Sequence, residues 1–235
     1  MKLLAFDTST ELISIAVTRT ADGTLWQHTG AGGAQASSGL IPAIEGLLAE
    51  AELRFDELDA IVFGQGPGSF TGLRTACSVA QGLAFGAGIP VLPVDTLLAV
   101  AEEARQQHAP QQASLRVLAL LDARMGELYA AHYEFSAGAW LRHEDHGLLR
   151  PQELTLGRSE VLAGNVFAEY DERLPVSVAV PRWPALPTAA ALLRLAPGLL
   201  AAGHAVAPEQ ALPRYIRDKV AKTTAERAAE KAALR

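Results

Sequence analysis

Cysteine is nearly absent from this sequence: Cys77 is the one cysteine among 235 residues. A single cysteine excludes a disulfide within the chain, so we expect a reducing compartment. Cys77 falls in a segment with helical spacing, where a small buried side chain is a commoner role than a reactive thiol. The sequence also lacks an apolar run of the roughly 20 residues that cross a membrane, and no basic segment leads into one at the start. We therefore expect a soluble, cytoplasmic protein.

Several common catalytic motifs are missing as well. The chain has no H-E-x-x-H, C-x-x-C or G-x-S-x-G pattern, so it carries no motif of the zinc proteases, the dithiol redox proteins or the α/β-hydrolases. The one close pair of histidines is His143 and His146, which flank Glu144 and Asp145. Residues three apart on a strand point to opposite faces, so we favour a solvated polar turn over a metal site there.

Basic charge is scarce except at the C-terminus. The segment from Arg214 to Arg235 holds seven Lys and Arg against three acids, which leaves 13 basic and 23 acidic residues in the rest of the chain. An acidic body of this kind is a poor nucleic-acid binder on its own, because phosphate affinity comes from clustered cations. The basic segment could contact RNA or an acidic partner, but a solvated charged helix is the commoner role for such a run.

The segment 60–74 runs an apolar strand into a glycine-rich turn and then into a helix. The β-branched and aromatic residues at 61–63 indicate a buried strand, and Gly66-Pro67-Gly68 predicts a tight turn. Free N–H groups at the start of the helix could hold a phosphate, but the lysine of a P-loop is missing. Ser69 or Thr71 would cap this helix. The candidate phosphate contacts are Asp7, Gly66, Gly68, Ser69, Thr71 and Arg74.

The helix expected at 70–86 is rich in small residues, chiefly alanine, glycine and serine. Such a helix lets another helix or a sheet approach its backbone closely. It is either a central core helix, which we favour, or a contact between two subunits.

Strands and helices alternate along the first part of the chain. We expect three short antiparallel strands within 3–26, a loop at 30–39 and a helix at 40–53 with Ser38 as its cap. After the central strand and helix, a strand at 91–95 leads into a helix at 96–107. This alternation predicts parallel pairing through crossovers.

The second part of the chain repeats the opening theme. After a polar linker candidate at 106–112, the apolar strand 117–124 reaches Asp122 as the first strand reaches Asp7, which suggests two related halves. Further expectations are strands at 127–133, 140–149 and 176–180 and a helix at 188–202. The predicted domains are residues 1–109 and 110–212, followed by a basic, helical tail at 213–235.

The two carboxylates at the strand ends, Asp7 and Asp122, are the best candidates for a catalytic role. A structural role is at least as common for such residues, because an aspartate after a strand often accepts N–H bonds in the next turn.

Four parts of the sequence carry a family resemblance. They are the strand 3–8 with the following Ser9, the run from Gly64 to Arg74, the segment from Leu121 to Glu127, and the motif from Pro213 to Ala221. Together they span nearly the whole chain, and the central run is specific. On these motifs the chain resembles the bacterial TsaB family, also called YeaZ.

The resemblance implies an α/β protein with an actin/Hsp70-like (ASKHA) fold, built from two ribonuclease-H-like domains with mixed sheets. It also implies a role in the threonylcarbamoyladenosine (t6A) modification of tRNA. In that system the metal-bearing paralogue TsaD transfers the threonylcarbamoyl group, the ATPase TsaE joins the complex, and TsaB is a non-catalytic scaffold. The implied partners are therefore TsaD and TsaE, a second copy when the chain is alone, and tRNA only through the complex. The resemblance implies no contact with a membrane and no cofactor of the chain's own. ATP or ADP is a candidate ligand of the assembled complex.

The resemblance also locates an interface and a departure from the family. TsaD-like proteins carry an H-x-x-x-H metal pair where this chain has the segment from Ala36 to Leu40, so those metal ligands are missing. Ala36 also replaces a histidine that many TsaB sequences have on this helix. We expect helices 40–53 and 70–86 to form a face that pairs with TsaD or with a second copy. The predicted interface residues are Leu40, Ile41, Ile44, Leu47, Phe70, Leu73, Arg74, Ala76, Cys77 and Ala80.

The alternative function is an ATP-binding enzyme of the actin and sugar-kinase type that acts alone. Asp7 would orient a metal-bound water, and the turn at 66–71 would hold phosphate. We favour it less, because the turn lacks the cationic partner that phosphoryl transfer uses. A protease has no nucleophile–base pair or metal motif in this sequence to support it.

Overall fold

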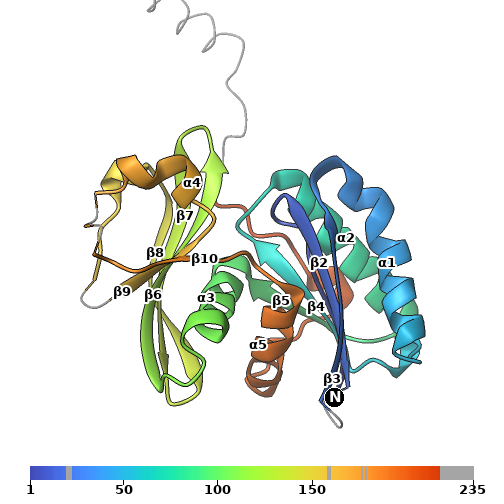
Figure 1. The fold of residues 1–235 in the computed structure, drawn as a ribbon. Helices are drawn as coiled ribbons and strands as arrows, with labels where there is room; N and C mark the ends of the chain where they lie inside the picture. The colour runs from blue at the N-terminus through green and yellow to red at the C-terminus, as the bar shows by residue number, and fades with distance from the viewer. Residues whose placement is uncertain (20–22, 158–159, 176, 178, 218–235) are drawn as a thin grey trace, which may run out of the picture.

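The computed structural model describes residues 1–19, 23–157, 160–175, 177 and 179–217 (Figure 1). Two five-stranded mixed sheets stand side by side, with helices α3 and α5 between them (Figure 1). Of the helices in these ranges, none is both long enough and apolar enough to cross a membrane.

The first sheet has the strand order β3-β2-β1-β4-β5. Its first three strands form the expected antiparallel meander, and β4 and β5 then pair in parallel beyond β1. The central strands are apolar throughout, as strands covered on both faces are. The strand bounds are β1 (Lys2–Asp7), β2 (Leu12–Arg19), β3 (Thr24–Ala31), β4 (Ala60–Gly66) and β5 (Val91–Asp95).

Helices cover both faces of this sheet. Alternate residues of β1 point to opposite sides: Leu4 and Phe6 join the core under α1 (Ala36–Glu50) and α2 (Phe70–Ala87). Leu3 and Ala5 face the other way, into the core with α3 (Thr96–His108) and α5 (Ala189–Ala201). The outer pair of helices, α1 and α2, therefore lies on the side of the sheet away from the second sheet (Figure 1).

The second sheet repeats the pairing of the first. Its order is β10-β9-β6-β7-β8, with β6, β7 and β8 antiparallel and β9 and β10 added in parallel. The two halves thus have the same topology, which confirms the prediction of two related halves and the ribonuclease-H-like, mixed-sheet fold class. The strand bounds are β6 (Ser114–Arg124), β7 (Glu127–Ser136), β8 (Ala139–Leu149), β9 (Glu160–Gly164) and β10 (Arg182–Pro184).

The remaining elements are short. One-turn helix α4 (Phe167–Tyr170) covers the outer face of the second sheet through Tyr170. Short 3-10 helices connect the other elements, at Gly33–Gln35, Phe55–Glu57, Pro151–Glu153, Asp171–Arg173 and Pro208–Gln210.

Four local predictions for the first half need correction. The predicted loop 30–39 is occupied by the end of β3, a 3-10 helix and the start of α1. Helix α1 begins at Ala36 rather than Leu40, because Ala36 is fully buried in the core. Ser38 therefore lies inside the helix and donates to the carbonyl of Gln35 at 3.1 Å instead of capping it. Ser69 occupies the cap position of α2 but makes no side-chain capping bond.

The second half also differs in part. Residues 176 and 178 of the predicted strand 176–180 lie outside the described residues, and 177, 179 and 180 are not in a strand. The parallel strands are β9 and β10 instead. Helix α5 begins as expected, with Thr188 Oγ1 accepting the N–H of Ala191 at 3.1 Å. The predicted helix of the tail falls largely on residues 218–235, outside the described residues; residues 213–217 form no helix.

The predicted boundary between the halves also differs from the packing. The sequence-based division assigns 110–212 to the second half, but α5 packs on β1, β2 and β4 of the first sheet. Beyond α5, Val206 pairs with Val91 of β5, and the 3-10 helix at Pro208–Gln210 packs against α2. The chain therefore returns to the first half after completing the second sheet. Burial of the apolar side of α5, with Leu192 and Ala196, drives this return.

Candidate functional site

A cavity of about 440 Å³ lies between the two halves, where the first strands of both sheets end. The turn after β1, the start of α2, the end of β6 and the last described segment of the chain form its walls. Its lining residues are Ser9, Thr10, Glu11, Gly33, Gly68, Ser69, Phe70, Leu73, Leu121, Asp122, Ala123, Arg124, Met125, Tyr129, Asn165, Arg214, Tyr215, Ile216 and Arg217.

The glycine-rich turn packs directly against the turn after β1. A Cβ on Gly72 would lie 1.8 Å from the carbonyl oxygen of Thr8, whose hydroxyl donates to the carbonyl of Gly72 at 2.6 Å. A Cβ on Gly68 would lie 2.5 Å from that of Ser9. The N–H of Ser69 donates to the carbonyl of Ser9 at 2.7 Å. Glycine at 68 and 72 thus serves a close contact between two backbones, and one N–H of the proposed phosphate cradle already has a protein acceptor.

The six candidate phosphate contacts are only partly brought together. Gly68 and Ser69 line the cavity, whereas Gly66 is buried and donates its N–H to Thr96 Oγ1 at 3.0 Å. Thr71 is exposed on the first turn of α2. The Arg74 side chain turns towards Tyr215, with Nε 2.9 Å from the tyrosine hydroxyl.

Asp7 lies beneath the cavity and is 1% exposed. Its Oδ1 accepts hydrogen bonds from the N–H of Ser9 at 2.9 Å and from the Ser9 hydroxyl at 2.7 Å. Its Oδ2 has no hydrogen-bond partner among the described residues, and a Cβ on Gly64 would lie 1.8 Å from it. Burial raises the pKa of this carboxyl, and the hydrogen bonds from Ser9 lower it. Burial has the larger effect, so the pKa rises to about 6. The carboxyl is therefore sealed from solvent by its neighbours.

Asp122 does reach the cavity, but its oxygens are occupied. Oδ1 accepts from the Tyr170 hydroxyl and from the N–H of Arg124, both at 2.7 Å, and Oδ2 is 3.0 Å from the Arg124 guanidinium. Burial has the largest effect on the pKa of Tyr170 and the hydrogen bond to Asp122 the next largest, and together they raise it to about 12. Asn165 accepts the N–H of Asp122 at 2.9 Å. Sequence reasoning missed Tyr170 and Asn165, because both come from the connection around α4 and no motif marks them.

The last described segment, Ala211–Arg217, crosses the cleft, and we call it the C-terminal strap. Gln81 of α2 donates to the carbonyl of Ala211 at 2.8 Å, and the N–H of Arg214 donates to the carbonyl of Gln65, at the end of β4, at 2.7 Å. On the second sheet, Arg217 contacts Glu127 at 2.6 Å. The motif noticed near the C-terminus thus joins α2 to the β6–β7 hairpin.

Most residues of the predicted helical interface are buried inside this chain, so the prediction needs correction. Seven of its members have side chains at most 5% exposed and belong to the core of this chain: Leu40, Ile44, Leu47, Leu73, Ala76, Cys77 and Ala80. The core role that we favoured for the small-residue helix holds for its inner side. Only Ile41, Phe70 and Arg74 of the predicted set are exposed.

The outer side of α2 carries a different set of residues. Arg74, Ser78, Gly82 and Phe85 recur at helical spacing and are all exposed, Phe85 by 79%. A Cβ on Gly82 or Gly86 would meet no atom within 4 Å. Exposed helix faces usually carry several charges, yet Arg74 is the one charged residue in the 18 residues of α2. Helical spacing from Arg74 would have identified this set from the sequence.

The structure also addresses the histidine pair. His143 lies in β8, which confirms the predicted strand at 140–149 in place of the polar turn, and its Nε2 is 2.9 Å from Glu134 Oε2. Among the described residues no group of three or more His, Cys, Asp or Glu is placed to hold a metal ion.

The sequence matches known proteins along nearly its whole length. It is 34% identical to the tRNA threonylcarbamoyladenosine biosynthesis protein TsaB of Escherichia coli, over 94% of this chain and 96% of that protein. This chain belongs to the TsaB family. A relative from Haemophilus influenzae with the same name is 41% identical over 133 residues, which are 55% of this chain and 52% of the relative.

Two further comparisons agree with this family. The family model described as TsaD, tRNA N6-adenosine threonylcarbamoyltransferase, matches residues 33–229. The solved structure of YeaZ from Pseudomonas aeruginosa is 37% identical, covers 91% of this chain and 99% of its own, and superposes with a TM-score of 0.81. The ASKHA fold class expected from the sequence is thereby confirmed.

Proposed function

We propose that this chain is a non-catalytic scaffold in t6A biosynthesis, which binds and activates a TsaD-type threonylcarbamoyltransferase together with the TsaE ATPase. The observation that carries the proposal is the outer face of α2, which is exposed, nearly free of charge and lined by glycine and serine. Such a face favours close packing of another helix. A second copy would occupy it when the chain is alone.

The state of the two candidate carboxylates supports a non-catalytic role. Asp7 is sealed beneath the cavity, and Asp122 already accepts from Tyr170 and Arg124. A catalytic carboxylate has to reach its substrate within hydrogen-bond distance. We assign the chain no cofactor of its own and place any ATP or ADP in the assembled complex. Because the body of the chain is acidic, tRNA would be held by the complex as a whole.

Substitution on the outer face of α2 tests the interface. Ser78→Arg and Gly82→Trp change exposed positions, so the fold should persist while affinity for TsaD falls at least tenfold. Ser136→Arg makes the matched change at an exposed position of the second sheet and should bind normally. Ala76 and Ala80 are unsuitable for this test, because both are fully buried. Normal TsaD binding by folded Ser78→Arg and Gly82→Trp would refute the interface.

Reconstitution tests the scaffold role itself. The modification reaction with TsaD, TsaE, tRNA and threonylcarbamoyl-AMP should require this chain, and Asp7→Asn should support it as well as the wild type does. Calorimetry of the isolated chain with ATP and magnesium should show no tight binding. Tight binding with hydrolysis would instead favour the ATP-binding enzyme.

A further inference from the structure

Arg74 is held in a fixed position on the outer face of α2 by two aromatic rings. Its guanidinium carbon lies 3.9 Å from the centre of the Phe70 ring and 5.9 Å from that of the Tyr215 ring. The two rings are themselves 5.2 Å apart, and Arg74 Nε donates to the Tyr215 hydroxyl at 2.9 Å. Stacking and this hydrogen bond together fix the plane of the guanidinium.

The outer edge of this guanidinium, which carries the two Nη groups, is available for binding. Nε is used by Tyr215, while the two Nη groups have no acceptor within the part of the chain that the structure describes. The three arginines that line the nearby cavity are already paired with acids: Arg124 with Asp122, Arg214 with Asp95, and Arg217 with Glu127. Arg74 alone of these four therefore presents a free, oriented pair of N–H donors.

We propose that Arg74 receives a carboxylate from an Asp or Glu side chain of the TsaD-type partner that docks on α2, and that Tyr215 is its positioning residue. The inference rests on the proposed scaffold function and names the chemistry of its docking site. A planar guanidinium with two parallel N–H donors matches a carboxylate in a bidentate pair. Because stacking fixes the plane beforehand, less side-chain entropy is lost on binding.

The surroundings of Arg74 favour a protein carboxylate over an RNA phosphate. Phosphate backbones are bound by clusters of cations, whereas Arg74 is the one charge on α2, followed along the face by Ser78 and Gly82. The chain up to residue 213 holds 13 basic and 23 acidic residues, which disfavours RNA. The open space at Gly82 admits a helix at short distance. The TsaD family model matches the region that contains α1 and α2, so a TsaD-type partner has counterparts of these helices to offer.

The proposal also gives the C-terminal strap a function. Tyr215 belongs to the strap, and the neighbouring Arg214 and Arg217 anchor it to Asp95 and Glu127. The strap thereby supplies the hydroxyl and one of the two rings that orient Arg74. Loss of the Tyr215 hydroxyl should weaken docking without removing any charge from the interface.

Binding of the full chain to the TsaD protein of the same organism, measured by calorimetry at two salt concentrations, tests the proposal. Arg74→Gln should weaken binding at least tenfold and flatten its salt dependence. Arg74→Lys should recover only part of the loss, because lysine keeps the charge but not the planar fork. Tyr215→Phe should weaken binding about threefold. Arg116→Gln, which removes an exposed arginine from the second sheet, is the matched control and should bind normally.

Charge reversal identifies the partner residue. Arg74→Glu should abolish binding, and an Asp→Lys or Glu→Lys change at one position on the helices of TsaD should restore it. If the wild type binds TsaD and Arg74→Gln binds equally well with an unchanged melting temperature, the carboxylate proposal is wrong and the scaffold proposal stands. If Arg74→Gln instead loses tRNA affinity while its TsaD affinity is unchanged, the ligand is a phosphate and the proposal is also wrong. If the folded wild type does not bind TsaD, the proposed function fails and the inference fails with it.

Discussion

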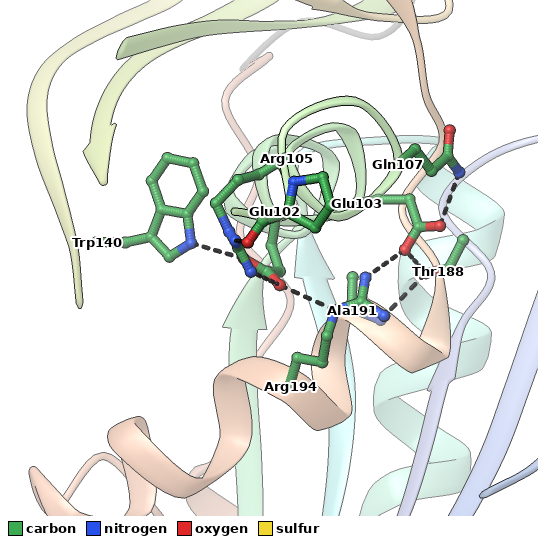
Figure 2. Close-up of polar contacts among 9 residues, drawn as sticks. Glu102, Glu103, Arg105, Gln107, Trp140, Thr188, Ala191 and Arg194 are labelled. Carbon is green, nitrogen blue, oxygen red and sulfur yellow. Dashed lines mark hydrogen bonds and ion pairs between the residues drawn. The ribbon is translucent and has the colours of Figure 1, made fainter. Parts of the chain in front are cut away.

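Trp140 of β8 donates its indole N–H to Glu102 of α3 at 3.0 Å, which joins the second sheet to the helix between the two halves (Figure 2). The same carboxylate accepts from Arg105 of α3 and from Arg194 of α5, at 2.9 Å each. Thr188 and Arg194 also contact the neighbouring Glu103 (Figure 2). One buried carboxylate thus connects α3, α5 and β8 and holds the two sheets in a single arrangement.

Glu102→Gln should lower the free energy of unfolding by about 2–4 kcal/mol, because it leaves Arg105 without its buried counter-charge and Arg194 with Glu103 alone. The Glu102 side chain is 4% exposed, so solvent screens the pair little. Asp56→Asn is the control: it breaks an exposed, solvent-screened pair with Arg54 and should leave the stability nearly unchanged. Urea denaturation measures both, and equal small losses would show that the network does not join the halves.

The same carboxylate predicts a loss of stability in acid. Burial acts to raise the pKa of Glu102, but the hydrogen bonds from Arg105, Trp140 and Arg194 outweigh it and lower that pKa. A carboxyl with a lowered pKa contributes stability above its unfolded value of 4.5, and this stability disappears as the pH falls through the folded value. The wild type should therefore lose more stability than Glu102→Gln below pH 4.5 in denaturation series at stepped pH.

Asp7 should act in the opposite direction. The pKa of Asp7 rises from 3.8 to about 6 on folding. The protonated carboxyl therefore contributes fully to the stability of the folded state below pH 3.8, and this contribution is lost as the pH rises through 6. The resulting change in the free energy of unfolding is about 3 kcal/mol. Asp7→Asn keeps an oxygen for the Ser9 bonds and removes the charge. We expect the variant to be about 1–3 kcal/mol more stable than the wild type at pH 7.5. Equal pH slopes for the two proteins between pH 4 and 6 would contradict this assignment.

Two glycines of α2 should respond oppositely to alanine. Gly72→Ala places a Cβ 1.8 Å from the Thr8 carbonyl oxygen, so the two turns have to separate. We expect a loss of more than about 3 kcal/mol. Gly82→Ala meets no atom within 4 Å and replaces an exposed helical glycine, which should add about 0.5–1 kcal/mol. Thermal and urea unfolding of both variants measure the difference, and a similar loss at both positions would contradict the packing.

Cys77 should react with thiol reagents only when the protein unfolds. The side chain is 4% exposed, its Sγ lies 3.3 Å from the carbonyl oxygen of Ala211, and burial raises the pKa of the thiol. The thiolate is the reactive species, so both effects protect it. Labelling rates in increasing urea should follow the unfolding transition. Rapid labelling of the native protein would show that the strap opens from α2.

The elements with strong local patterns were predictable from the sequence. The apolar strands that end in Asp7 and near Asp122 occur where expected, as do the Gly66-Pro67-Gly68 turn and helix α5. The strand β9 was missed, because five residues of apolar character do not distinguish a strand from a short helical segment. The start of α1 was misplaced, because glycine, alanine and serine before Leu40 favour a loop until the burial of Ala36 is known.

The candidate site was likewise predictable from the sequence only in part. Its residue types and the family resemblance were in the sequence, and helical spacing places Arg74, Ser78 and Gly82 on one side of α2. Local pattern could not show which side of α2 faces the core, so seven buried residues were assigned to an interface. It also could not bring Tyr215 to Arg74, because these residues are separated by 141 positions.

The sequence by itself determined the order of strands and helices as far as β8, the family and the repeated theme of two halves, because all of these depend on local periodicity and on contiguous motifs. The tertiary structure decided what is accessible. It sealed Asp7 beneath Gly64 and Ser9, turned Leu73 and Ala80 inward, and left Arg74 oriented and free on the surface. The physical reason is that burial and the pairing of charges depend on segments that meet only after the chain has returned from the second sheet to the first.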